Sequence, residues 1–158
     1  MKIKLLAVGK LKNPLYFQAM QNYLIRLRPM VQLRIEEVRD FPMRKGMQPK
    51  IAQDQEGEAL NERLGEDSFV VVLDVKGKQK TSEDFAELIG KWQGMSVKEV
   101  TFIIGGSYGV SEEILRNARE RLSLSKMTFP HELARLVFVE QLYRAFTILK
   151  GLPYHHAG

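Results

Sequence analysis

The chain has 158 residues, of which 44% are hydrophobic and 27% are charged. This length predicts one domain, residues 1–158, and this composition excludes a disordered chain. The sequence contains no cysteine, which excludes disulfides, thiolate nucleophiles and Cys-ligated metal sites. The longest apolar run, Phe69 to Leu73, is far shorter than the roughly 20 residues of a membrane-spanning helix. We therefore expect a cytoplasmic protein that does not enter a membrane.

Basic residues outnumber acidic ones, 24 Lys and Arg against 19 Asp and Glu, which gives a net charge of +5. This surplus favours polyanionic partners, nucleic acid first and acidic membranes second, although a merely basic enzyme explains it equally well. The stretch from Arg116 to Lys150 carries seven basic and three acidic residues. We therefore expect the surface that faces phosphate groups in the second half of the chain.

Strand-like and helix-like segments alternate along the chain. From patterns of apolar and β-branched residues, strands are expected at 2–8, 32–38, 69–75, 100–104 and 122–125. From caps and helical periodicity, helices are expected at 14–27, 51–64, 81–92, from 111 onward, and from 130 to 149. This alternation predicts an α/β fold with a mostly parallel sheet and helices on both faces. The pattern does not give the order of the strands.

The last expected helix is apolar on nearly every side. Between Leu133 and Leu149, twelve of seventeen residues are apolar, too many for one stripe that faces a core. We expect the sheet to cover one side and a second subunit the other, with complete wrapping by the same chain as the alternative. If Phe138 faces the partner, replacing it by Glu weakens the dimer. Glu140 and Arg144 are spaced as an i,i+4 ion pair.

Ligands of open α/β sheets bind where strands end, which directs attention to three loops, residues 72–78, 104–109 and 122–131. The glycine loop, residues 105–109, suits a nucleotide-like ligand, but it lacks the spacing of the dinucleotide and P-loop motifs and also fits an ordinary turn. Asp74 ends another strand, either as a catalytic carboxylate or as a polar strand end. His131 is either a base or a helix-terminal residue. The adjacent pair His155 and His156 makes a poor metal site.

Segments throughout the chain resemble the RlmH (YbeA-like) family of bacterial large-subunit ribosomal RNA methyltransferases. The resemblance covers the whole length, and the run from Leu122 to His131 is its most specific part. The other matching segments are Lys2 to Lys10, Val72 to Asp74 with Gly77 and Lys78, Phe102 to Gly109, Arg135, Glu140 to Ala145, and Pro153 to His155. The tail departs slightly from the family pattern, because His155 is followed by His156, Ala157 and Gly158 where relatives often have a single His and then a charged residue. The resemblance leaves the role of His156 open.

The resemblance implies a SPOUT-type α/β fold with a C-terminal trefoil knot, a homodimer, and S-adenosylmethionine as methyl donor. It further implies methylation of N3 of a pseudouridine in helix 69 of 23S ribosomal RNA, on the assembled ribosome. The cofactor site that it implies consists of Leu73, Gly105, Leu124, Ser125, Lys126, Met127, Thr128 and Phe129. No metal is implied, because the methyl donor is already activated.

Methylation at N3 requires removal of the proton that this nitrogen carries. Candidates for the general base are His155, His131 and Glu140. Arg144 is the candidate cation for the developing uracil anion, and Tyr154 is a candidate for stacking or hydrogen bonding with the target base. Two other interpretations stay open: a ribosome-binding assembly factor without catalysis, and a flavodoxin-like nucleotide-binding protein.

The C-terminal tail, residues 152–158, follows the last expected helix. Segments beyond the last element often fray, yet this tail contains Tyr154, His155 and His156. Imidazoles exchange protons near neutral pH, so we expect the tail to serve catalysis. In a dimer it would reach the partner's cofactor.

Overall fold

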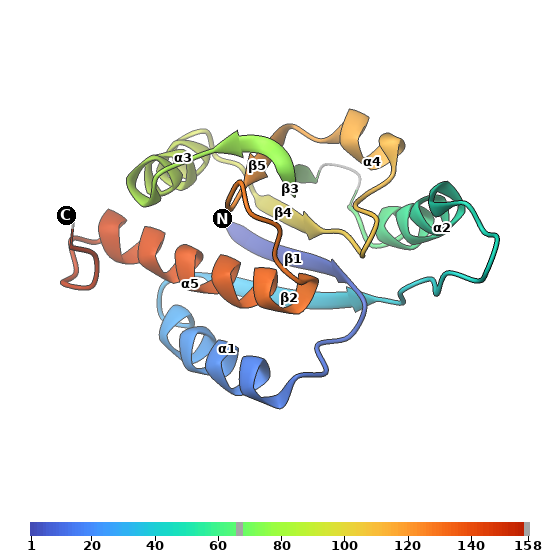
Figure 1. The fold of residues 1–158 in the computed structure, drawn as a ribbon. Helices are drawn as coiled ribbons and strands as arrows, with labels where there is room; N and C mark the ends of the chain where they lie inside the picture. The colour runs from blue at the N-terminus through green and yellow to red at the C-terminus, as the bar shows by residue number, and fades with distance from the viewer. Residues whose placement is uncertain (66–67, 157–158) are drawn as a thin grey trace.

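The computed structural model describes residues 1–65 and 68–156, and strands and helices alternate as predicted (Figure 1). The strands are β1 (Lys2–Val8), β2 (Gln32–Val38), β3 (Phe69–Gln79), β4 (Glu99–Ile104) and β5 (Glu120–Ser123). The helices are α1 (Pro14–Leu27), α2 (Pro49–Asn61), α3 (Ser82–Gly94), α4 (Glu112–Asn117) and α5 (His131–Leu149).

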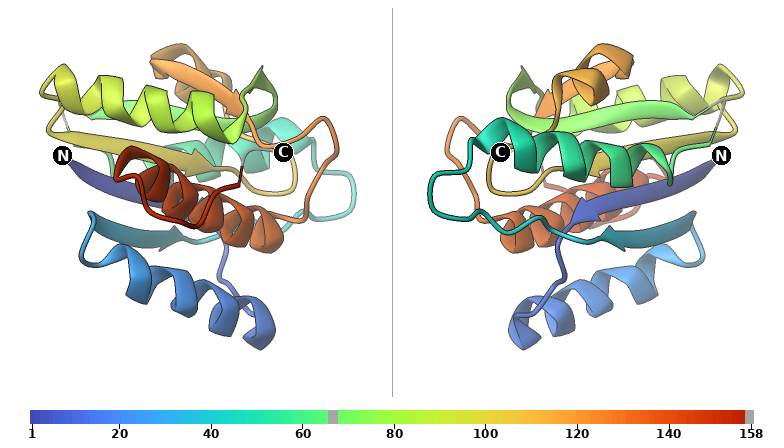
Figure 2. Two further views of the ribbon diagram at one scale, coloured as in Figure 1. Left: turned by 90° about the vertical axis from the view of Figure 1, so that its left-hand side faces the viewer. Right: turned by 90° about the vertical axis from the view of Figure 1, so that its right-hand side faces the viewer.

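The five strands form one parallel sheet in the order β2-β1-β4-β3-β5. Helices α1, α5 and α3 lie on one face, with α5 in the middle (Figure 1). Helices α2 and α4 cover the other face, as the right-hand view of Figure 2 shows for α2. The predicted α/β fold, with helices on both faces of a parallel sheet, is therefore confirmed. The trefoil knot stays a prediction.

Local signals in the sequence begin α1, α3 and α4 within one residue of the expected start, whereas α2 begins at Pro49, two residues before its expected start. Asn13 accepts hydrogen bonds from the backbone N–H groups of Leu15 and Tyr16, ahead of α1. Thr81 and Asp84 form a capping box at the start of α3, and Ser111 caps α4. Such caps satisfy N–H groups that have no partner inside the helix.

A buried arginine fastens the start of α5 to the end of β1. The Arg135 side chain donates to the backbone oxygens of Val8 at 2.7 Å and Gly9 at 2.8 Å, and it pairs with Glu37 at 2.9 Å. One turn earlier, Glu132 accepts from the backbone N–H groups of the β1–α1 connection. Burial lowers the pKa of Arg135, while the Glu37 carboxylate opposes this shift. These contacts fix the position of α5 across the ends of β1 and β2.

Helix α5 faces the sheet with Phe138, which is fully buried and packs against Phe85 and Phe102. Phe138 therefore does not face a partner subunit, so the condition set for the Phe138→Glu prediction is not met. A helix that is apolar nearly all round does not reveal from its sequence which side faces the sheet. The opposite side of α5 is a half-buried stripe formed by Leu133, Val137, Glu140 and Arg144. We call these four residues the outer stripe. Within the described residues, no helix is long and apolar enough to cross a membrane.

Strand β3 runs to Gln79, beyond the expected end at residue 75, because it pairs with β5 a second time. Leu122 of β5 is paired first with Leu73 and then with Lys78, so the residues between them bulge out of the sheet. A Cβ atom on Gly77 would lie 2.4 Å from the carbonyl carbon of Leu122. Only glycine permits this close approach of the two strands.

Replacing Gly77 by Ala is expected to lower the free energy of unfolding by about 1–3 kcal/mol, because the new methyl group must push β3 and β5 apart. Gly94→Ala is the matched control, since a Cβ atom there meets nothing within 4 Å. Urea denaturation of both variants measures the effect. Equal stabilities would contradict the steric argument.

Candidate active site

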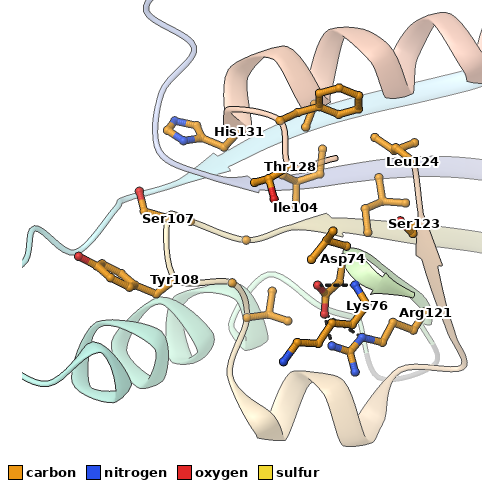
Figure 3. Close-up of a pocket in the computed structure, with 18 of the residues that line it drawn as sticks. Asp74, Lys76, Ile104, Ser107, Tyr108, Arg121, Ser123, Leu124, Thr128 and His131 are labelled. Atoms are coloured by element: carbon orange, nitrogen blue, oxygen red, sulfur yellow. Dashed lines mark hydrogen bonds and ion pairs between the residues drawn. The ribbon is translucent and has the colours of Figure 1, made fainter. Parts of the chain in front are cut away.

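A pocket of about 790 Å³ opens at the ends of β4 and β5 and at the bulge of β3 (Figure 3). It is formed by the three loops that the sequence singled out. The expected cofactor residues that line it are Leu73, Gly105, Leu124, Ser125, Met127, Thr128 and Phe129. Lys126 is exposed and is not among the lining residues, so its assignment has no support from the pocket.

The glycine loop closes on itself so tightly that Gly105 has no room for a side chain. A Cβ atom on Gly105 would lie 2.7 Å from the carbonyl carbon of Gly109 and 2.9 Å from a Val110 methyl carbon. Gly109 has a φ of +81° and donates to the backbone oxygen of Gly106 at 3.0 Å. This conformation leaves backbone groups at the pocket wall, where a ligand can approach them closely.

Asp74 has a structural partner, which decides between its two interpretations. Its carboxylate accepts from Nε of Arg121 at 2.8 Å, from a second nitrogen of the same side chain, and from the Lys76 N–H at 3.2 Å (Figure 3). A carboxylate engaged in this way holds the bulge of β3 against β5. It is therefore a poor candidate for a proton acceptor.

His131, the first residue of α5, lines the pocket (Figure 3). A Cβ atom on Gly9 would lie 3.7 Å from its Nε2 atom, so the ring also stands beside the end of β1. Of the candidate bases, His131 is the one that the chain places at its own pocket.

The remaining candidate residues lie together near the other end of α5. Arg144 binds Glu140 through Nη2 at 2.6 Å and Nε at 3.1 Å, and the Tyr154 hydroxyl donates to the same carboxylate at 3.0 Å. His155 contacts Arg144 Nη1 at 3.2 Å and Glu83 at 2.6 Å. We call these four residues, Glu140, Arg144, Tyr154 and His155, the tail cluster. Ala157 and Gly158, the end of the expected catalytic tail, lie outside the described residues.

The pocket and the tail cluster are far apart within one chain. Arg144 lies thirteen positions after His131 in α5, which corresponds to about 20 Å along the axis at the α-helical rise. Figure 1 shows the strand ends and the C-terminal tail at opposite ends of α5. The predicted helix from 130 to 149 already implied this distance, but the candidate residues were grouped by their chemistry alone.

The hydrogen bonds within the tail cluster determine which of its members can act as a base and which stays a cation. Glu140 accepts from Arg144, Tyr154 and Gln141, so its carboxylate has little capacity left to act as a base. The hydrogen bond to Glu140 raises the pKa of Arg144. Burial, followed by hydrogen bonds that include Glu140, raises the pKa of Tyr154. Arg144 therefore stays a cation and Tyr154 a neutral phenol at neutral pH.

The tautomer of His155 follows from its two partners. Arg144 can only donate, so Nδ1 of His155 accepts and Nε2 carries the hydrogen that points to Glu83. The backbone N–H of Glu83, followed by the contact with His155, lowers the pKa of Glu83. An orienting carboxylate at one ring nitrogen is the usual support of a catalytic histidine.

Sequence reasoning missed two polar residues of α2 at the glycine loop. The Gln53 amide donates to the backbone oxygen of Tyr108. Glu56 is buried, accepts from the Phe41 N–H at 2.9 Å, and has no partner for Oε2 among the described residues. A Cβ atom on Gly106 would lie 2.6 Å from this oxygen. The many charges of α2 had indicated a surface helix, so nothing in the sequence predicted these contacts with the glycine loop.

Burial raises the pKa of Glu56, and nearby Asp40 adds to the shift while the Phe41 N–H opposes it. The folded protein therefore holds this proton more tightly than the unfolded chain does, and stability falls as the pH rises above the carboxyl's ordinary pKa. Glu56→Gln removes this penalty, so its melting temperature should rise relative to the unmodified protein between about pH 4 and pH 7. The exposed Glu58→Gln control should show no such trend. If the melting temperatures of both variants changed with pH in the same way, the result would contradict a raised pKa for Glu56.

Comparisons with known proteins agree with this geometry. A family model described as "Predicted SPOUT methyltransferase" matches residues 1–155. The protein named ribosomal RNA large subunit methyltransferase H from Bacillus pumilus is 42% identical over 158 residues, covering 98% of this chain and 99% of the relative. A protein of the same name from Halothermothrix orenii is 43% identical and covers 98% of this chain and 99% of the relative. Another from Christiangramia forsetii is 42% identical and covers 99% of both chains. The chain therefore belongs to the SPOUT methyltransferase family.

Proposed function

We propose that the protein transfers a methyl group from S-adenosylmethionine to N3 of a pseudouridine in helix 69 of 23S ribosomal RNA, on the assembled ribosome in the cytoplasm. The printed names of its relatives support a large-subunit ribosomal RNA substrate. The observation that carries the proposal is the pocket at the ends of β4 and β5 and the bulge of β3, which contains seven of the eight expected cofactor residues.

The pocket residues fit the proposed methyl donor. A volume of about 790 Å³ is within the usual range for sites that enclose a ligand of this size. Leu73, Ile104 and Leu124 supply apolar walls for a base, while the glycine loop offers backbone groups for polar atoms. When bound, S-adenosylmethionine supplies a methyl group already activated by a positively charged sulfur.

The active site is proposed to combine two copies of the chain. The tail cluster lies about 20 Å from its own pocket, as estimated from the helical rise, so it serves catalysis only at the pocket of a second copy. The outer stripe of α5 offers the contact, because Leu133 and Val137 continue directly into Glu140 and Arg144. A dimer built on this stripe brings the tail of one copy toward the pocket of the other.

The chemistry then follows from the properties of the tail cluster. His155 takes the N3 proton at Nδ1 once Arg144 Nη1 turns from that nitrogen to the uracil ring, and Glu83 stabilises the imidazolium that results. Arg144 stabilises the negative charge that develops on the uracil ring. Tyr154 stacks on the target base, and Glu140 holds Arg144 and Tyr154 in place. His131 at the pocket wall is the alternative base, and the experiment below separates the two.

Val137→Glu is expected to split the dimer, because it places a charge in the proposed apolar contact. The unmodified protein should sediment at about twice the 18.2 kDa of one chain, and the variant should sediment at the mass of one chain. Ile51→Glu on α2 is the matched control, since this exposed residue lies on the opposite face of the sheet. A monomeric unmodified protein at micromolar concentration would remove the two-chain site.

Deleting residues 152–158 should leave cofactor affinity and the melting temperature nearly unchanged, because residues 152–156 contribute no side chain to the hydrophobic core. Methylation of ribosomes that lack the modification should fall at least 100-fold. The measurement uses labelled methyl donor and maps the labelled nucleotide. His155→Ala should reproduce the loss, whereas His156→Ala should not, because His156 is exposed and forms no hydrogen bond among the described side chains.

Three outcomes would change the proposal. Label at another nucleotide would replace the proposed substrate position. Full activity of His155→Ala with loss in His131→Ala would make His131 the base. Ribosome binding without any methyl transfer would favour an assembly factor that has kept the fold.

A further inference from the structure

The loop between β2 and α2, residues 39–48, carries exposed basic side chains that the proposed mechanism does not use. Arg39, Arg44 and Lys45 are exposed, and within residues 1–65 and 68–156 none of them forms an ion pair. Figure 1 shows this loop projecting beyond the end of β2. We call residues 39–48 the basic loop.

The backbone of the basic loop is held at its base and at its tip. At the base, the Phe41 N–H donates to the buried Glu56 at 2.9 Å. At the tip, the Met47 N–H donates to the Arg44 oxygen at 3.0 Å, and Gly46 has a φ of +83°, which closes a tight turn. Arg44 and Lys45 are therefore presented at the outer end of an ordered loop, which reduces the entropy lost when they bind a partner.

Two further cations stand beside the base of this loop. The Gly9 N–H donates to the Val38 oxygen at 2.8 Å, and a Cβ atom on Gly9 would lie 3.7 Å from Cβ of Asp40. The chain continues from Gly9 into the exposed residues Lys10 and Lys12. Residues 10–12 and 39–48 together contain five basic residues and one acidic residue.

This basic surface adjoins the pocket. A Cβ atom on Gly9 would lie 3.7 Å from Nε2 of His131, and His131 lines the pocket. An extended polyanion that places one of its units in the pocket therefore runs over these cations. The adjacent charges and the adjacent pocket favour a nucleic acid over a membrane, because a membrane surface would not enter the pocket.

We propose that Lys10, Lys12, Arg39, Arg44 and Lys45 bind the phosphate backbone of the RNA next to the target nucleotide, an inference that rests on the proposed function. Contacts to phosphates fix the position of an RNA without reading its bases. They release counterions, so their contribution to affinity weakens as the salt concentration rises. The surface therefore acts on substrate binding and leaves the methyl-transfer step itself unchanged.

The test compares two variants that lose the same number of positive charges. The first carries Lys10→Gln, Arg39→Gln, Arg44→Gln and Lys45→Gln. The control carries changes of exposed residues near the amino-terminal ends of the strands, away from the pocket: Lys2→Gln, Arg63→Gln, Lys91→Gln and Lys98→Gln. Both should fold and bind the methyl donor normally, because all eight side chains are exposed and lie outside the pocket lining.

In the first variant, KM for ribosomes should rise at least tenfold while kcat at saturation stays unchanged. The slope of log affinity against log salt should fall by about 3, since each lost phosphate contact contributes roughly 0.7–0.9. The control should stay within about twofold of the unmodified protein. Equal KM values and slopes in the two variants would overturn the proposal, because they would show a general charge effect or none.

Direct binding to ribosomes, measured by filtration alongside activity, keeps this inference separate from the proposed function. An unmodified protein that binds ribosomes but transfers no methyl group contradicts the function. The binding of the two variants still decides whether the basic surface holds the RNA.

Discussion

The buried contact between Arg135 and the end of β1 determines how the two halves of the proposed active site are arranged. The guanidinium donates to the Val8 and Gly9 oxygens and pairs with Glu37. A buried charge is tolerated only when its partners are correctly placed, so this contact fixes the start of α5. The same position sets His131 at the pocket, and the length of α5 then carries the tail cluster to the far end. One helix thus separates the tail cluster from the pocket within a chain.

Local patterns predicted much of the fold, and contacts between distant residues account for the differences. Strands β1 and β2 and helix α1 have the expected bounds. The signals that define them, apolar periodicity and nearby Pro or Gly residues, are local in the sequence. The end of β3 was missed because its last residues are polar and its second pairing depends on Gly77 beside Leu122. The sequence could not predict which way Phe138 points, because α5 is apolar on nearly all sides.

The same distinction applies to the site. The pocket residues follow from the rule for strand ends and from the family resemblance, since both concern continuous segments such as Leu122 to His131. Glu56 and Gln53 were missed, because their role depends on the packing of α2 against the glycine loop. Charge counted along the sequence pointed to residues 116–150. In space, however, Lys10 and Lys12 lie beside the basic loop, and this convergence is visible only in the fold.

Mixed dimers test the central claim that each active site combines the pocket of one chain with the tail of another. One chain carries Gly105→Val, which fills the tightly closed glycine loop, and the other lacks residues 152–158. Each is expected to be inactive alone. A mixed dimer contains one intact pocket facing one intact tail, so mixing should restore up to about a quarter of the unmodified activity on ribosomes. No restored activity in verified mixed dimers would contradict the account.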